Sequence, residues 1–341
     1  MRRTAAVLAV DGGNSKVDVA LIARDGTLLA TASGGTVSHQ QVGMSAGMAR
    51  LERVVRSASA QAGLAVSGPV ADLGLYCLAG ADAPPDIRQL EAALRATGLT
   101  RTTSVLNDCR AGLRAGSDRG WGVIVICGSG VNACGIAPDG RVAAFAGLGP
   151  ISGDWGGGGD IGRAALAAAV RARDGRGPRT VLERRVPAHF SLSRPSAVTN
   201  ALYTEQIAES RLRELAPVVF AAAAAGDPVA RGILDRLADE LATMAIAIIR
   251  RLRLARTDPD VVLAGGIFRA DDADFLDRLA TAVHRVAPAA RLLPLRTPPL
   301  LGAALLGLEA LPGGRRPAAV QRLRAAFESD ARRGTRRRPS A

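Results

Sequence analysis

The sequence has few aromatic residues, a single lysine and no long apolar run. Aromatic residues make up only 3% of the 341 residues, so an aromatic core is excluded and we expect a core of Ala, Val, Leu and Ile. No apolar run reaches the roughly 18 residues of a membrane span, and no apolar signal segment follows the first residues. We therefore expect a cytoplasmic protein that does not enter a membrane and is long enough for two domains.

Cysteine is also scarce. The four cysteines form no CxxC pair and no zinc-ligand spacing. Because a cytoplasmic chain keeps its thiols reduced, we expect all four to be small buried apolar residues. They are Cys77, Cys109, Cys127 and Cys134.

The net charge of +13 is concentrated near the end of the sequence. From Arg315 onward, nine arginines stand against Glu328 and Asp330, a balance of +7 that leaves +6 for the rest. We expect residues 312–341 to form a C-terminal segment that ends in a basic, disordered tail. Since no aromatic stacking platform accompanies this charge, we expect no nucleic-acid partner.

A glycine turn between two apolar strands occurs twice, in residues 7–22 and again in residues 122–136. Glycine lets the backbone adopt positive φ and lets a ligand approach peptide N–H groups, so each turn is a candidate anion cradle. Either turn alone could be an ordinary tight hairpin, but duplication at a domain-scale spacing favours two cradles that hold a polyphosphate. Lys16 could reach a phosphate as a compact charge, or lie in solvent at the strand edge.

Asp108 ends a short predicted strand, residues 103–108, and precedes a predicted helix over residues 109–115. Ligands of open α/β sheets bind at the carboxyl ends of strands, which makes Asp108 a candidate site residue. An Asp at this position could also cap the helix that follows, and the two roles can coexist.

Residues 147–162 contain four consecutive glycines, 156–159, between Asp154 and Asp160. Such a run is incompatible with the interior of a helix or strand, so we expect a loop here and a helix over residues 163–173. Asp154 and Asp160 are candidates to contact a polar or cationic ligand. Asp160 could instead only cap the following helix.

The remaining pattern predicts β-β-β-α-β-α twice, with extra helices between residues 188 and 254 of the second copy. A buried strand over residues 261–267 contains Gly265 and Gly266, and a closing helix covers residues 299–307.

In this order, the motifs resemble those of the actin, hexokinase and heat-shock-chaperone superfamily, and more closely the BadF-type ATPase and N-acetylglucosamine kinase family. The resemblance extends to about Gly307 and implies an α/β, two-lobed, actin-like or hexokinase-like ATPase fold with an interdomain cleft. We expect an N-terminal lobe over residues 1–112, a C-terminal lobe over residues 113–311, and the C-terminal segment described above.

The resemblance implies an ATP-binding role for both glycine turns and for an adenosine turn at Gly265 and Gly266. Asp108 would be the base that accepts the proton of the attacking sugar hydroxyl, and Asp11 would hold Mg²⁺, through water. The expected nucleotide contacts are Asp11, Gly12, Gly13, Asn14, Ser15, Lys16, Gly128, Ser129, Gly130, Gly265 and Gly266. The expected sugar contacts are Ser38, His39, Asn107, Asp108, Asn132, Gly149, Asp154, Trp155 and Asp160.

Two departures from the family pattern concern the sugar. Ser38-His39 stands where N-acetylhexosamine kinases have Asn-His. After Asp154, Trp155 stands where those kinases have a Glu, and Asp160 is an additional acid. An added carboxylate suits an ammonium group better than a neutral acetamide. The pattern is similar to an actinobacterial type of glucosamine kinase, so we expect ATP-dependent phosphorylation of D-glucosamine to glucosamine 6-phosphate.

Other functions remain open at this point. An N-acetylglucosamine or glucose kinase is the first alternative. The ATPase activators of radical dehydratases hold an iron–sulfur cluster with cysteines, whose spacing this sequence lacks. A regulatory sugar sensor would carry a DNA-binding helix-turn-helix, for which we find no segment before Val7. Members of the resembled family often form homodimers.

Overall fold

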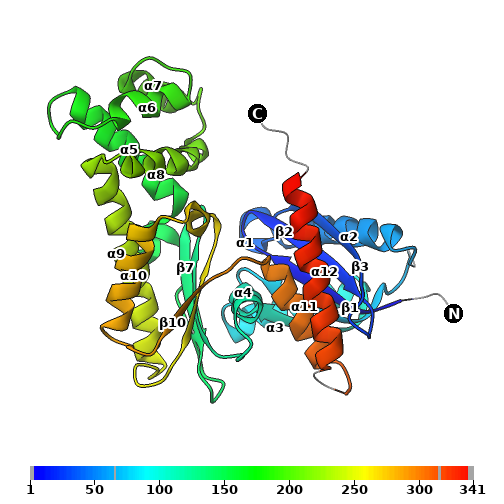
Figure 1. Ribbon diagram of the computed structural model, residues 1–341. Helices are drawn as coiled ribbons and strands as arrows, with labels where there is room; N and C mark the ends of the chain where they lie inside the picture. The colour runs from blue at the N-terminus through cyan, green and yellow to red at the C-terminus, as the bar shows by residue number, and fades with distance from the viewer. Residues whose placement is uncertain (1–3, 65–66, 314–315, 337–341) are drawn as a thin grey trace. The chain divides into compact units, whose positions relative to one another are not determined.

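The computed structural model describes residues 4–64, 67–313 and 316–336 (Figure 1). The chain divides into two compact units. The first comprises Met1–Gly120 together with Leu295–Ala341, and the second comprises Trp121–Pro294.

The first unit contains a five-stranded sheet with the order β3-β2-β1-β4-β5. Strands β1, β2 and β3 form an antiparallel meander, and β4 and β5 continue the sheet in the direction of β1. The strands are β1 (Ala5–Gly12), β2 (Lys16–Ile22), β3 (Leu28–Gly35), β4 (Ala71–Leu78) and β5 (Thr100–Asn107).

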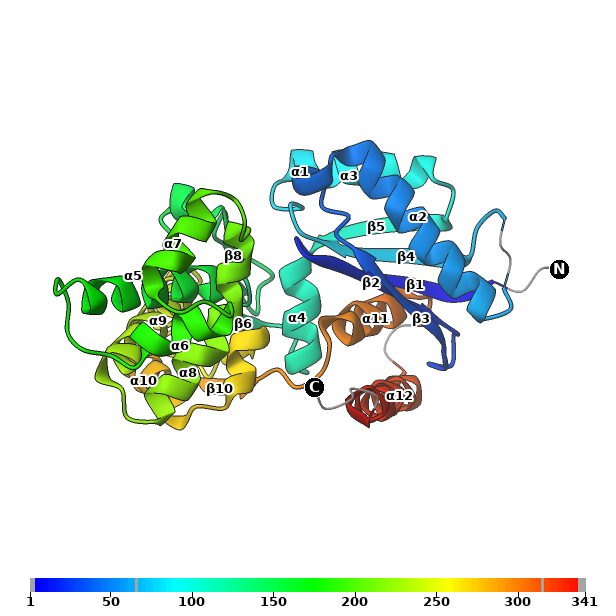
Figure 2. The same ribbon diagram turned by 90° about the horizontal axis from the view of Figure 1, so that it is seen from above.

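Helices cover both faces of this sheet, and alternate residues of β1 point to opposite faces. Leu8 and Val10 pack with residues of α2 and α3, while Val7 and Ala9 pack with residues of α11 and α12. Figure 2 shows α11 between the sheet and α12. The helices of the unit are α1 (His39–Val42), α2 (Met44–Gln61), α3 (Pro84–Ala96), α4 (Asp108–Gly116), α11 (Pro299–Ala310) and α12 (Pro317–Arg336).

The second unit contains a sheet of the same design, with the order β10-β9-β6-β7-β8. Strands β6, β7 and β8 form the antiparallel meander, and β9 and β10 run parallel to β6. The duplication predicted from the glycine turns is therefore confirmed. The strands are β6 (Gly122–Cys127), β7 (Val131–Ile136), β8 (Val142–Ala144), β9 (Asp260–Ala264) and β10 (Arg291–Pro294).

The helical insertion of the second unit lies between β8 and β9, as the sequence predicts. The core of the second unit is aliphatic, with phenylalanines only at Phe220, Phe268 and Phe275 among its buried residues. The helices are η1 (Gly149–Ser152), α5 (Gly157–Arg173), α6 (Leu182–His189), α7 (Pro195–Tyr203), η2 (Glu209–Leu215), α8 (Ala216–Ala224) and α9 (Pro228–Arg251), followed after β9 by η3 (Gly266–Ala270) and α10 (Ala273–His284).

The observed division of the chain differs from the expected boundaries. Position 112 lies inside α4, and the chain from Leu295 onward packs in the first unit rather than closing the second. Two glycines of α11 explain this packing: a Cβ on Gly302 would lie 1.8 Å from the Ala111 carbonyl oxygen, and one on Gly307 would lie 2.4 Å from Val7. The sequence pattern did not predict that α11 packs in the first unit, because the partners of a helix are determined by tertiary contacts.

The C-terminal segment also differs from expectation. Helix α12 runs through Arg336, so the backbone is helical over part of the stretch predicted to be a disordered tail. Its residues Ala319, Leu323 and Phe327 are buried. Residues 337–341 lie outside the described residues.

All four cysteines are buried and free, as predicted. No single helix in the described parts of the chain is long and apolar enough to cross a membrane. Only the bent pair Glu209–Ala224 and Pro228–Arg251 meets that criterion jointly, with 117° between its helices.

Candidate active site

Asp108 is the first residue of α4, directly after β5. The side chain of Asn107 caps the helix by accepting a hydrogen bond from the Cys109 N–H at 2.9 Å, so the cap is not Asp108. Burial raises the pKa of Asp108 to about 6, and the nearby carboxylate of Asp82 contributes. A carboxylate with a pKa near neutrality is suited to accept a proton at physiological pH.

Asp11 is the last residue but one of β1 and lies opposite Asp18 on β2. Burial raises the pKa of Asp11 to about 7, with further contributions from Asp108 and Asp18 that Lys16 opposes. Burial and like charge both disfavour the ionised form. The first unit therefore gathers three acids around the start of its glycine turn.

Lys16 forms an ion pair with Asp18, and Ser33 donates a hydrogen bond to the other oxygen of Asp18, each at 2.5 Å. The Lys16 side chain is 67% exposed. Asn14 and Ser15 are exposed with it at the tip of the turn, which closes through the Gly13 N–H and the Lys16 carbonyl at 3.0 Å. Gly12 is buried, and a Cβ there would lie 2.6 Å from Leu78.

The acids of the first unit fit a magnesium ion only as a partial ligand set. No group of three or more His, Cys, Asp or Glu side chains able to hold a metal is found in the described residues. Mg²⁺ commonly keeps several waters and takes one or two protein carboxylates together with phosphate oxygens. Asp11, whose buried carboxyl is surrounded by like charge, is consistent with that role.

The loop between β3 and α1 carries two unsatisfied polar atoms. Ser38 occupies the N-cap position of α1, yet its hydroxyl makes no capping bond. The buried Ser38 Oγ and His39 Nδ1 have no hydrogen-bond partner among the described residues. Thr36 fixes the loop to the glycine turn by donating to the Gly13 carbonyl at 2.9 Å and accepting from the Ser38 N–H. Buried polar atoms without partners call for an explanation, and these two are candidates for ligand contacts.

Asp82 is a candidate site residue that sequence reasoning missed. Its carboxylate accepts a hydrogen bond from the Asn107 amide at 2.7 Å. Burial raises its pKa, Asp86 adds to this, and His39 opposes it. A Cβ on Gly80 would lie 2.8 Å from the ring of His39. The glycine therefore leaves room for this ring beside the loop that carries Asp82. Only the pair of prolines after it marked this segment as a break, so no sequence signal identified Asp82.

The second glycine turn is bound by the first turn of α5. The N–H groups of Gly158 and Gly159 donate to the carbonyls of Gly128 and Ser129, at 2.8 and 3.1 Å. A Cβ on Gly157, whose φ is +78°, would lie 2.5 Å from Gly130. The glycine run therefore begins the helix, and the expectation of a loop up to residue 162 was wrong. The first N–H groups of a helix need outside partners, and glycine lets the hairpin come close enough to supply them.

The Gly265-Gly266 turn follows β9 and contacts the same hairpin. Gly265 has φ of +112°, and a Cβ there would lie 2.2 Å from the Cys127 carbonyl oxygen. Ser129, Gly130, Gly265 and Gly266 are all exposed. Within the second unit, the predicted phosphate and adenosine turns are thus brought together.

Other predicted sugar contacts of the second unit lie on β7 and on the segment after β8. The Asn132 amide packs against Gly147, and the Gly149 carbonyl accepts from the Asp154 N–H at 3.0 Å. Asp154 accepts a hydrogen bond from Ser152. Trp155 stacks under the guanidinium of Arg236, which lies 3.9 Å from the ring centroid.

Asp160 has two protein partners. It accepts from the Gly156 N–H at 2.8 Å, at the start of α5, and pairs with Arg163 at 2.8 Å. The carboxylate therefore caps the helix and needs no ligand cation to offset its desolvation.

Two α/β units with the same strand order, each opening on a glycine hairpin, define the class of actin-like and hexokinase-like ATP-using proteins. The chain belongs to the BadF/BadG/BcrA/BcrD ATPase family, whose sequence model matches residues 8–307.

Relatives of known sequence are sugar kinases by name. The N-acetylmuramic acid/N-acetylglucosamine kinase of Clostridium acetobutylicum is 28% identical over 263 residues, 76% of this chain and 85% of that protein. The N-acetyl-D-glucosamine kinase of Dictyostelium discoideum is 25% identical over 311 residues, 88% of this chain and 97% of that protein.

Solved structures agree with the fold. A Chromobacterium violaceum protein, provisionally assigned as an N-acetylglucosamine kinase, superposes with a TM-score of 0.68 at 27% identity, over 89% of this chain and 99% of that one. A ROK family glucokinase from Streptomyces griseus, solved with glucose and AMPPNP, has a TM-score of 0.53 at 17% identity, over 89% and 97%, and shares the fold.

Proposed function

We propose that this protein is an ATP-dependent amino-sugar kinase with N-acetylglucosamine as its preferred sugar substrate. The observation that carries the proposal is Asp108, a carboxylate with a raised pKa at the end of β5, close to Asp11 of the glycine turn. Both named relatives are N-acetylglucosamine kinases, which supports the same substrate class.

Asp108 would act as the general base. The sugar hydroxyl oxygen forms a bond to the γ-phosphorus of ATP, the bond to the ADP oxygen breaks, and the hydroxyl proton passes to the Asp108 carboxylate. Phosphoryl transfer requires mainly positioning and charge stabilisation, so one well-placed base is sufficient.

The glycine turns would hold the phosphates through backbone N–H groups of their exposed residues, which are residues 14–16 in the first unit and residues 129–130 in the second. A bound Mg²⁺ would offset the negative charge of the phosphates. Asp11 would hold it, directly or through water, and Lys16 could leave Asp18 for a phosphate because its side chain is largely exposed. Gly265 and Gly266 would contact the adenosine.

The sugar would be bound by the unsatisfied groups of the first unit. Ser38 Oγ and His39 Nδ1 offer hydrogen-bonding atoms without partners among the described residues. Asn107 is oriented by Asp82, which fixes its amide. Asn132, Gly149 and Asp154 of the second unit remain predicted sugar contacts.

The pairing of Asp160 changes the expected choice of sugar. The ammonium group of D-glucosamine would be favoured by a carboxylate that has no partner in the protein. Asp160 instead forms an ion pair with Arg163 and accepts a hydrogen bond from a backbone N–H. N-acetylglucosamine is therefore placed first. Glucosamine is the second candidate because Asp154 has no cationic partner in the described part of the chain.

The test is a coupled ADP-release assay on the purified protein with ATP, Mg²⁺ and each of N-acetylglucosamine, glucosamine and glucose. We expect the highest kcat/KM with N-acetylglucosamine. A higher kcat/KM with glucosamine would indicate that Asp154 binds the ammonium group of that sugar. No sugar-dependent ADP release with any of the three would contradict the proposal.

A further inference from the structure

Helix α4 begins with Asp108, so the orientation of this helix sets the position of the proposed base. Asp108 and Arg114 are separated by about 9 Å along the helix axis. Over that length, a tilt of about 6° about Arg114 moves Asp108 by about 1 Å. Misplacement of a catalytic group by about 1 Å can cost about a hundredfold in rate.

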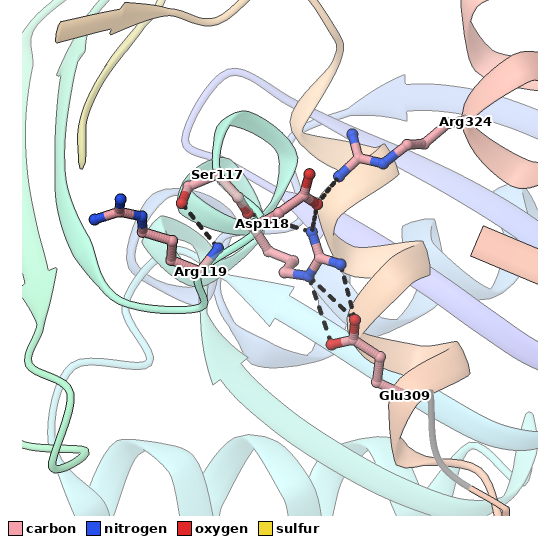
Figure 3. Close-up of polar contacts among 6 residues, drawn as sticks. Ser117, Asp118, Arg119, Glu309 and Arg324 are labelled. Atoms are coloured by element: carbon pink, nitrogen blue, oxygen red, sulfur yellow. Dashed lines mark hydrogen bonds and ion pairs between the residues drawn. The ribbon is translucent and has the colours of Figure 1, made fainter. Parts of the chain in front are cut away.

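The far end of α4 is held by Arg114, whose side chain is only 4% exposed. Its Nε and Nη2 atoms donate to Glu309 of α11, with the shortest distance 2.8 Å, and its Nη1 atom donates to the Ser117 carbonyl and to Asp118 (Figure 3). One guanidinium thus joins α4, α11 and the turn after α4. A buried arginine needs such a full set of acceptors, and two-sided donation fixes its orientation.

Asp118 extends the contact to α12. Arg324 of α12 donates to the same Asp118 oxygen that accepts from Arg114 (Figure 3). The turn is itself ordered by the Ser117 hydroxyl, which accepts from the Arg119 N–H at 3.2 Å. Although partial burial acts to raise the pKa of Asp118, Arg324 and Arg114 hold it below its ordinary value. The acid therefore stays ionised as the link between two arginines.

Helix α12 lies outside the region that matches the family model, because the match ends at residue 307 and α12 begins at Pro317. It is packed closely: a Cβ on Gly26 would lie 2.2 Å from the Ala319 carbonyl oxygen. Arg322 of the same helix pairs with Asp25, in the turn between β2 and β3. The helix therefore offers two arginines with different partners, one on the α4 turn and one on the β2–β3 turn.

We propose that Arg114 is a positioning residue for Asp108, and that α12 shares in this positioning through the Arg324–Asp118 ion pair. The catalytic step assumed here is that of the proposed function. Loss of the ion pair removes the tie between Asp118 and α12 and lets the carboxyl end of α4 move, while the sugar and nucleotide contacts keep their places.

The kinetic test compares Arg324→Met with Arg322→Met, which removes an ion pair of the same kind from the same helix. Arg324→Met is expected to lower kcat about fivefold with each KM within about twofold, and Glu309→Gln to lower kcat about tenfold. Arg322→Met should leave kcat within about twofold, with a similar change in Tm. Arg324→Lys should restore most of the lost kcat. Equal kcat losses in Arg324→Met and Arg322→Met, or a raised KM at unchanged kcat, would overturn the proposal.

Amide hydrogen exchange on the full chain tests the coupling without using activity. Backbone N–H groups of residues 109–116 should exchange faster in Arg324→Met than in the wild type, and at the wild-type rate in Arg322→Met. Equal exchange in all three proteins would refute the link between α12 and α4. If the wild type shows no sugar-dependent ADP release, the proposed function fails, and the exchange result still decides whether α12 positions α4.

Discussion

The two glycine hairpins lie on sheets of the same strand order but have different chemistry. The first combines an exposed turn with three acids, Asp11, Asp18 and Asp108, two of which have pKa values raised toward neutrality. The second has no acid in its turn, and its carbonyls are bound by the glycine start of α5. The two units share one scaffold, and in the proposed function the acids of the first turn transfer the proton while the second turn supplies backbone N–H donors.

The largest effect is expected for the acid that only the first unit has. Asp108→Asn removes the proton acceptor and keeps the side-chain shape, so kcat should fall about a thousandfold with the sugar KM little changed. The coupled ADP-release assay measures both. The control is Asp72→Asn, at the other end of the neighbouring strand β4, which should keep normal turnover. Wild-type kcat in Asp108→Asn would remove Asp108 as the base.

The second hairpin should be sensitive to shape rather than to charge. Gly157→Ala adds a Cβ at 2.5 Å from Gly130 and forces a non-glycine residue to φ of +78°. We expect a loss of about 3 kcal/mol in the free energy of unfolding, measured with denaturant, and a raised KM for ATP.

Gly226→Ala is the matched control for that substitution, because its φ is +84° and nothing lies within 4 Å of a Cβ there. The backbone strain alone should cost about 1 to 2 kcal/mol, with the ATP KM unchanged. Equal losses in both variants would mean that the contact between α5 and the hairpin contributes nothing.

The acids of the first hairpin should make stability depend on pH. The pKa of Asp11 is about 7 in the folded protein, against an ordinary value of 3.8, so the folded protein retains this proton where the unfolded chain has lost it. The stabilisation is complete below about pH 4 and is lost as pH rises to about 7. Relative to Asp11→Asn, the metal-free wild type should lose about 1 to 3 kcal/mol between pH 4 and pH 8.

Denaturant unfolding of both proteins across this pH range measures the difference, and Mg²⁺ should reduce it at pH 8. Activity should show the opposite trend, because Asp108 must be ionised: kcat/KM should fall as pH drops below about 6. A stability difference that does not change with pH would contradict the raised pKa of Asp11.

The smallest effect is expected at Asp160, for which the sequence left two roles open, a contact with the sugar or only the capping of a helix. Asp160→Asn weakens a helix cap and an ion pair with Arg163, which is half exposed, and should cost about 1 kcal/mol or less of stability. The ratio of kcat/KM values for glucosamine and N-acetylglucosamine should stay the same. A selective loss of glucosamine turnover would place Asp160 in the sugar site after all.

The sequence predicted those features that depend on neighbours along the chain. The repeated strand–turn–strand patterns located both hairpins, and the Asn107-Asp108 pair after an apolar strand located the proposed base. Features that depend on distant partners were missed. The start of α5 at Gly157 requires the carbonyls of the hairpin, the return of α11 requires contact with α4, and Asp82 has significance only through Asn107.

The central claim is that a sugar hydroxyl, rather than water, receives the phosphoryl group of ATP. The direct measurement is quantitative ³¹P NMR of a reaction with ATP, Mg²⁺ and N-acetylglucosamine, in which ADP, inorganic phosphate and sugar phosphate are resolved. We expect one sugar phosphate for each ADP formed. With Asp108→Asn, neither ADP nor sugar phosphate should rise above background. ADP formed together with inorganic phosphate and no sugar phosphate would contradict it, and would indicate an ATPase that acts on some other partner.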